Sequence, residues 1–287
     1  MYSGEQRACR RNPLTRELVL LERMVQVAVI ALTLATSGRA QVQDTILKKS
    51  PLFTGRDALL LGAFAAGTAV LAPLDMRIAA RLQNPATQEN RFLSRSATGF
   101  RFLGMPGSLV TGAGIYVVGR INGQRRAQSL GLHSVESMVL ADLLGAGIKL
   151  AAGRQRPSID IGRPSSFQLW RGLRGDAYQS FPSGHTITAF AFASSATREI
   201  QFWRPHAAWY VGTVLYGGAS LVGASRMYNN MHWASDVMAG AAIGTIVGLK
   251  VVRYTHSHPG NGIDRKLIKG KPQNTIQVSP ILFTIEF

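Results

Sequence analysis

The chain has 287 residues, 46% of them hydrophobic, and a formal net charge of +17, with no composition break that would divide it into two domains. Its basic residues are scattered among apolar segments, which argues against nucleic acid as a partner and favours anionic lipid headgroups or phosphorylated substrates. Cys9 is the only cysteine, so an internal disulfide is excluded.

The amino-terminal residues 1–40 resemble a secretory signal peptide. A polar, arginine-containing stretch precedes an apolar run over residues 24–35, and small residues then allow cleavage after Ala40. An uncleaved membrane anchor is the alternative, although the apolar run is short for a membrane span. Residues 41–56 follow as a polar arm.

Six apolar segments come next, and their pattern predicts helices and an all-α fold. They cover residues 58–74, 105–118, 135–152, 186–200, 206–224 and 234–251. A short amphipathic helix is also predicted at residues 76–82. The apolar segments are at or below the roughly 20 residues that a membrane crossing requires. In the last segment, Gly240, Gly244 and Gly248 predict close contact with another helix.

Residues 255–287 form a basic tail. Apolar side chains alternate from Thr275 to Phe287, which predicts a short strand. His256 and His258 also alternate, but no other residue of a metal-ligand type lies near them in sequence. The pattern therefore predicts no metal site here.

The stretch from Ser225 to Asp236 places polar groups between two long apolar segments. If the chain turns helical near His232, Asp236 lies four residues on and faces the same side. The carboxylate could then accept the proton of one imidazole nitrogen and leave the other nitrogen as a base or nucleophile. Arg226 offers a planar set of donors that suits an oxyanion. Such a spacing also occurs on ordinary helix surfaces, so it does not establish a site by itself.

Two upstream stretches strengthen this interpretation. Residues 180–185, with the sequence SFPSGH, form a turn that opens an apolar helix, where free backbone N–H groups favour an anion. Farther upstream, Lys149 and Arg156 close another apolar segment, and Pro157 disfavours helix at Arg156. The loop between the two stretches, residues 154–179, forms either a wall of the site or a plain surface connection.

Taken in order, these residues resemble the three-part signature of the type 2 phosphatidic acid phosphatase and vanadium-dependent haloperoxidase superfamily. The resemblance covers about residues 134–254 and implies a six-helix bundle. It places a helical phosphatase domain at residues 57–254, with the motifs within residues 149–236.

The resemblance also implies roles for individual residues. His232 is the expected nucleophile, Asp236 is expected to hold and polarise it, and His185 is the expected general acid. The expected phosphate ligands are Lys149, Arg156, Ser183, Gly184 and Arg226. No metal and no cofactor is expected, and the predicted reaction is hydrolysis of a phosphomonoester or pyrophosphate through a phosphohistidine. The expected substrate is a phosphorylated lipid, with a small phosphoester as the other possibility.

Two other functions use the same pocket. A haloperoxidase would bind vanadate at His232, and a non-catalytic membrane protein would only bind phosphate there. The expected location is the cell envelope, with the protein membrane-associated or periplasmic after export. Signal cleavage, six crossings and an external active site cannot all hold, which favours these locations over the alternative, an integral inner-membrane protein.

Overall fold

The computed structural model describes residues 53–269, and all regular structure within this range is helical, which confirms the predicted helical class. The predicted signal peptide and the predicted strand over residues 275–287 lie outside the described residues. The helices are α2 (Gly55–Leu71), α3 (Asp75–Leu82), α4 (Pro85–Gln88), α5 (Arg91–Phe102), α6 (Ser108–Ile121), α7 (Arg125–Ala152), α8 (Gly184–Trp203), α9 (Pro205–Tyr228), α10 (Ala234–Ser257) and α11 (Gly262–Leu267).

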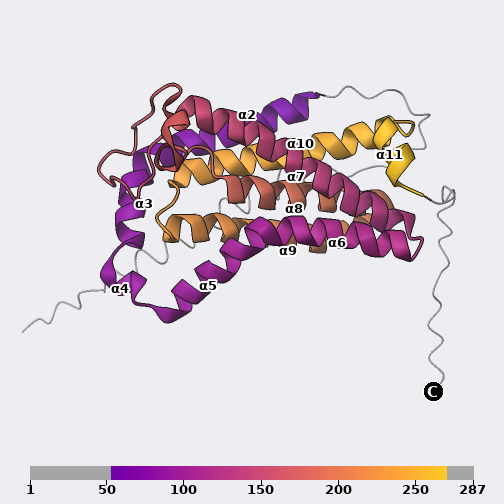
Figure 1. The fold of residues 1–287 in the computed structure, drawn as a ribbon, viewed down its shortest axis with the longest axis horizontal. Helices are drawn as coiled ribbons and strands as arrows, with labels where there is room; N and C mark the ends of the chain where they lie inside the picture. The colour runs from indigo at the N-terminus through magenta and orange to yellow at the C-terminus, as the bar shows by residue number, and fades with distance from the viewer. Residues whose placement is uncertain (1–52, 270–287) are drawn as a thin grey trace, which may run out of the picture. The chain divides into compact units, whose positions relative to one another are not determined.

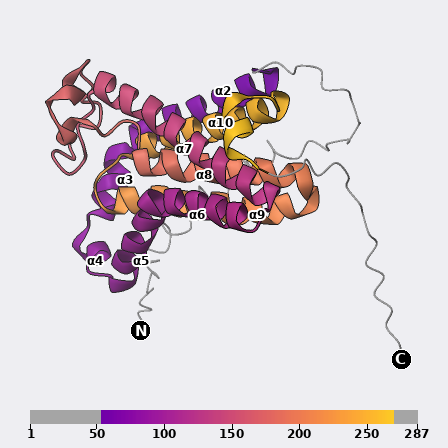
Figure 2. The same cartoon turned by 45° about the vertical axis from the view of Figure 1, so that its right-hand side comes forward.

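Helix α8 is the centre of the arrangement, because it packs against α7, α9 and α10 (Figure 1). Helix α6 lies along α7, α2 lies along α10, and α5 contacts α9, so these three form an outer layer (Figure 2). The core between α7 and α8 is built from completely buried apolar side chains: Met138, Ala141, Ile187 and Ala191.

The contact between α8 and α10 depends on the glycines of α10, as the sequence predicts. A Cβ atom on Gly240 would lie 2.7 Å from the carbonyl oxygen of Ser183, and one on Gly244 would lie 2.8 Å from the amide nitrogen of Ala191. Real Cβ atoms do not approach other atoms so closely. Only glycine therefore lets the two backbones come together here.

We expect Gly244→Ala to destabilise the fold by about 1 to 3 kcal/mol, because the added methyl group must push α8 and α10 apart. Gly147→Ala in α7 is the matched control, since a Cβ there meets no atom within 4 Å. The control should be neutral or stabilising by up to about 1 kcal/mol. Thermal unfolding in detergent measures both variants, and equal melting temperatures would contradict the close contact.

Helical structure extends farther than the sequence patterns predict. Helix α7 begins at Arg125 rather than near Ser134, and its first half buries polar side chains that interrupt the apolar pattern. One of them, Gln128, is satisfied by the carbonyl oxygens of Gly119 and Lys269. Helix α5 was not predicted, and Asn90 caps it by accepting from two backbone N–H groups. At the other end, α10 and α11 continue past the predicted limit at residue 254.

Three helical segments within the described residues are long and apolar enough to cross a membrane: Gly55–Leu82, Arg91–Ile121 and Ala234–Ser257. The first two of them have few buried residues, and large apolar side chains such as Val70 and Val110 are exposed on their surfaces. Such surfaces are unfavourable in water and favourable in lipid. These helices indicate a membrane protein.

Candidate active site

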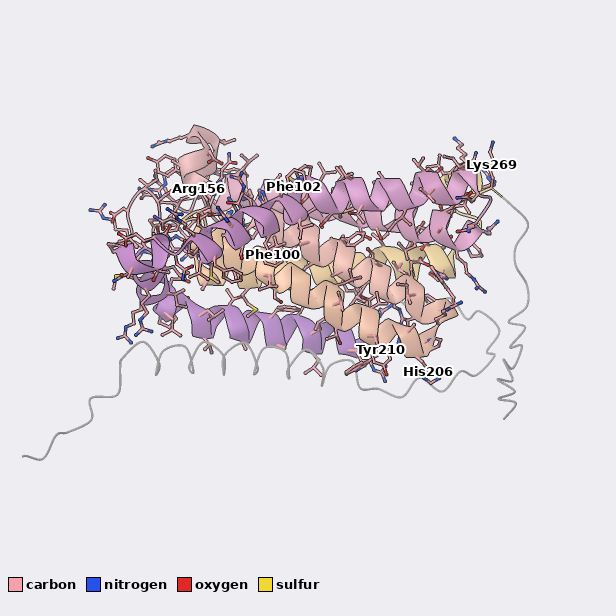
Figure 3. The ribbon with its side chains drawn as sticks, turned by 90° about the horizontal axis from the view of Figure 1, so that it is seen from below. Phe100, Phe102, Arg156, His206, Tyr210 and Lys269 are labelled. Atoms are coloured by element: carbon pink, nitrogen blue, oxygen red, sulfur yellow. The ribbon has the colours of Figure 1, made fainter. Side chains whose placement is uncertain are left out.

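The three parts of the predicted signature meet at one end of the helices. Helices α7 and α9 end there, and α8 and α10 begin there, so chain direction alone brings the three sequence stretches together. In Figure 3, Arg156 marks this end, and Lys269 marks the opposite end. The charges of Lys149, Arg156 and Arg226 all lie close enough to interact with the imidazole of His185.

The orientation of His232 is set by a backbone carbonyl. Its Nδ1 lies 2.6 Å from the carbonyl oxygen of Ser180, and the ring is buried. Because a carbonyl oxygen only accepts hydrogen bonds, Nδ1 carries the proton and Nε2 keeps its lone pair. Nε2 lies 3.4 Å from Nη1 of Arg156, so the free nitrogen faces a cation.

Asp236 does not bond directly to His232, and here the structure differs from the prediction. The closest separation, from Oδ2 of Asp236 to Nδ1 of His232, is 3.8 Å. The carboxylate instead accepts from the Ser180 hydroxyl at 2.5 Å and from the Trp233 amide at 2.9 Å. Since Ser180 also binds His232 through its carbonyl, Asp236 positions the imidazole through Ser180.

A buried charge network supports Asp236, and no pattern in the sequence predicts it. Arg154 donates to Oδ1 of Asp236 at 2.5 Å and to Oδ2 of Asp75 at 2.7 Å, and it also binds the hydroxyl of Ser235. The Asp75 carboxylate accepts in turn from the Ser235 amide at 2.9 Å. All four residues are buried, so one guanidinium pairs with two carboxylates away from water.

The predicted phosphate ligands supply three cations. Lys149 donates to the carbonyl oxygen of Gln179 at 2.9 Å, and Nη2 of Arg156 binds Oδ1 of Asp176 at 2.6 Å. The Asp176 side chain is 72% exposed, so an incoming phosphate can displace it from Arg156. Arg226 is buried, and its Nε has no hydrogen-bond partner among residues 53–269. That donor is available to an oxyanion.

The start of α8 contributes less than the sequence predicts. The Ser183 amide donates to the backbone carbonyl of Asp236 at 3.0 Å, so it is not free for an anion. Gly184 lies beside Lys149, because a Cβ there would be 3.6 Å from the lysine Cε. The loop over residues 154–179 folds onto the site, with the Arg156 amide donating to Ala177, and it therefore forms a wall rather than a remote connection.

The environment of His232 keeps its imidazole neutral. Burial, together with the charges of Lys149 and Arg156, lowers the pKa of His232 to about 3, although Asp236 opposes the shift. At neutral pH the ring is therefore uncharged, with its proton on Nδ1, and Nε2 is available as a nucleophile.

Comparison with known proteins relates the part of the chain that holds this site to one family. Residues 130–258 match the PAP2 superfamily, and this range contains all eight predicted site residues. This part of the chain is therefore similar to the PAP2 superfamily. Among the solved structures, the PAP2 type phosphatidylglycerolphosphate phosphatase from Bacillus subtilis has the same fold, with a TM-score of 0.53 and 22% sequence identity over 70% of this chain and 96% of that one.

Two curated relatives extend the comparison of the PAP2 region. A lipid A 1-phosphatase from Porphyromonas gingivalis is 39% identical over 119 residues, which are 39% of this chain and 22% of the relative. An undecaprenyl-diphosphatase from Sulfolobus acidocaldarius is 28% identical over 143 residues, which are 50% of this chain and 64% of the relative. The chain thus spans less than two thirds of the length of either relative.

Proposed function

We propose that this protein is a metal-independent phosphatase that hydrolyses a phosphomonoester or pyrophosphate on a phosphorylated lipid, through a phosphohistidine at His232. The observation that carries the proposal is the neutral imidazole of His232, whose free Nε2 faces Arg156. The lipid and diphosphate names of the two relatives support the choice of substrate class.

In the first step, Nε2 of His232 attacks phosphorus, and the bond from phosphorus to the leaving oxygen breaks. His185 donates a proton to that oxygen. In the second step, a water oxygen attacks the same phosphorus, and His185 takes back one proton from the water. The bond from phosphorus to Nε2 breaks, which restores His232 and releases phosphate.

The three cations stabilise the charge that develops on the phosphoryl oxygens. Lys149, Arg156 and Arg226 approach the site from α7, from the loop and from α9, so they surround the transferred group. Each such donor contributes about 2.7 to 4 kcal/mol of transition-state stabilisation. Fixed cations can supply the charge that a metal ion supplies in other phosphatases, which is why we propose a metal-independent reaction.

A lipid substrate is supported by the apolar surface of the loop beside the site. Phe167, Leu169, Trp170 and Leu173 are all at least half exposed on this loop, which also carries Arg156. Such side chains suit acyl chains or the membrane interface. In this proposal α2 and α6 to α10 form the six-helix bundle of the superfamily, embedded in a membrane of the cell envelope with the site at headgroup level.

The test is phosphate release from a lipid phosphate in mixed micelles and from a soluble aryl phosphate, as initial rates in EDTA. We expect release to persist in EDTA and the lipid to be preferred. Strict dependence on an added divalent ion would contradict the metal-independent reaction. Halide oxidation that requires vanadate, without phosphate release, would favour the haloperoxidase instead.

The low pKa of His232 predicts that kcat/KM falls only at unusually low pH on the acid side of the pH–rate profile. An ordinary imidazole is half protonated near pH 6.5, whereas His232 stays unprotonated until about pH 3. We therefore expect kcat/KM for an aryl phosphate to show no loss from nucleophile protonation between pH 6.5 and 4. Lys149→Met removes a cation that lowers this pKa. The fall of kcat/KM in acid should therefore begin at higher pH in this variant, even though its maximal rate is lower.

Lys266→Met is the control for that profile, because Lys266 is exposed at the opposite end of the helices. If kcat/KM falls at the same acid pH in Lys149→Met and in the control, the effect of Lys149 on the pKa of the His232 nucleophile is contradicted.

The same pKa shift lowers the stability of the folded protein in acid. The unfolded chain binds this proton below about pH 6.5 and the folded chain does not, so stability should fall from pH 6.5 toward pH 3.

A further inference from the structure

A second cluster of ionisable side chains lies at the end of the helices opposite the phosphoryl site. It consists of His133 on α7, Glu199 on α8, His256 on α10 and Asp264 on α11. Sixteen residues separate His133 from Lys149 along α7, a distance of about 24 Å in a helix. Figure 1 shows α11 far from the loop that covers the active site, so the cluster takes no part in the proposed reaction.

The carboxylate of Glu199 is the centre of the cluster. Its Oε1 lies 2.5 Å from Nδ1 of His133 and 3.0 Å from Nε2 of His256. The side chain is completely buried, and its second oxygen, Oε2, has no hydrogen-bond partner among the described residues. A buried carboxylate oxygen without a partner is costly, so this oxygen is available as a ligand for a cation.

The arrangement around His133 matches the outer shell of a metal site. Its Nε2 lies 3.2 Å from Oδ1 of Asp264, on the side of the ring away from Glu199. Histidines that bind metals commonly donate their second N–H to a carboxylate in this way. Asp264 is fixed by Asn261, whose side chain accepts from the Asp264 amide at 2.9 Å.

We propose that His133 Nδ1, His256 Nε2 and the Glu199 carboxylate bind a divalent transition-metal ion, with zinc as the best fit. One ligand atom from each residue lies within 4.8 Å of the others. Zinc bonds of about 2.0 to 2.2 Å to nitrogen and oxygen place ligand atoms about 3.4 Å apart in a tetrahedron. An ion would therefore replace the short hydrogen bonds and move the ligand atoms apart by less than about 1 Å.

Charge and access both suit such an ion. Two neutral imidazoles, the Glu199 carboxylate and the neighbouring Asp264 carboxylate balance a divalent cation. His256 is 34% exposed, so the site is open to solvent on one side, which gives an entry path and a position for a fourth ligand. The ring of Phe202 stacks on His256 at 3.9 Å and limits its movement.

The ion would join three helices that meet at this end. His133, Glu199 and His256 come from α7, α8 and α10, and Asp264 attaches α11 through the outer shell. Bound metal stabilises a folded chain because the unfolded chain lacks the assembled ligands. The inferred role is therefore structural.

The test uses full-length protein without a histidine tag, purified in detergent and stripped with EDTA. After equilibration with zinc chloride and desalting, elemental analysis measures bound zinc per chain. We expect one zinc in the wild type and background zinc in His256→Ala. His258→Ala is the matched control, because His258 lies near the same helix end but bonds Ser257 and Tyr254 instead of Glu199. It should keep one zinc.

Asp264→Asn gives a graded second measurement. It removes an outer-shell carboxylate and should weaken zinc binding by about 10 to 100-fold without abolishing it. Zinc should also raise the melting temperature of the wild type and of His258→Ala, but not of His256→Ala. No bound zinc in the wild type, or equal zinc in His256→Ala, would overturn the site and leave His133 as an imidazolium between two carboxylates. Neither readout depends on phosphatase activity.

Discussion

His232→Ala is expected to reduce phosphate release by a factor on the order of 10⁴ to 10⁶, the size of effect that loss of a catalytic nucleophile has in other enzymes. The reason is geometric, since Nε2 of His232 is the unprotonated nitrogen that faces the cations. The measurement is phosphate release from an aryl phosphate with the purified variant. His206→Ala, an exposed histidine at the start of α9, is the matched control and should keep wild-type activity.

A labelling experiment separates a nucleophilic role from a general loss of folding. His185→Ala lacks the residue that activates water, but an aryl phosphate has a good leaving group and can still phosphorylate His232. Radioactive phosphate should therefore accumulate on His185→Ala, with the acid lability of a phosphohistidine. The double variant His185→Ala, His232→Ala should take up no label. Substantial phosphate release by His232→Ala would contradict the proposed mechanism.

Much of the active site could be predicted because its chemistry lies in short sequence stretches. Lys149, Arg156, His185, Arg226 and His232 carry charge or imidazole groups beside apolar helices, where such groups stand out. The structure brings these stretches to one end of the helices because the successive helices α7 to α10 run in alternating directions. The helical class and most helix positions could also be predicted, because they follow from the spacing of apolar residues within short stretches of sequence.

The parts that could not be predicted depend on contacts between residues far apart in sequence. Asp75 and Ser235 are 160 positions apart, and nothing near Asp75 indicates that it pairs with Arg154. The direct bond expected from the four-residue spacing of His232 and Asp236 fails because the Ser180 carbonyl occupies Nδ1. Likewise, His256 showed no metal-ligand partners in sequence, since Glu199 and His133 come from other helices.

Arg154→Met is expected to destabilise the protein by about 3 to 5 kcal/mol, because it leaves buried carboxylates without their shared cation. Arg154 is almost completely buried, and both Asp75 and Asp236 are fully buried. Arg163→Met is the matched control, since Arg163 pairs with Asp160 at 3.3 Å on the surface. An exposed pair of this kind contributes at most about 1 kcal/mol. Unfolding in detergent, induced by heat or by denaturant, measures the stability of each variant.

The same substitution should also lower activity in protein that remains folded. Asp236 binds the hydroxyl of Ser180, whose carbonyl orients His232, so loss of Arg154 loosens the nucleophile through two contacts. A displacement of about 1 Å in an active site can reduce the rate by about 10²-fold. Because Arg154 does not touch the phosphate in this scheme, kcat should fall while KM changes little. Adding Asp75→Asn to Arg154→Met should restore part of the lost stability, since one unpaired carboxylate is removed. If Arg154→Met is no less stable than Arg163→Met, the buried network does not hold the site together.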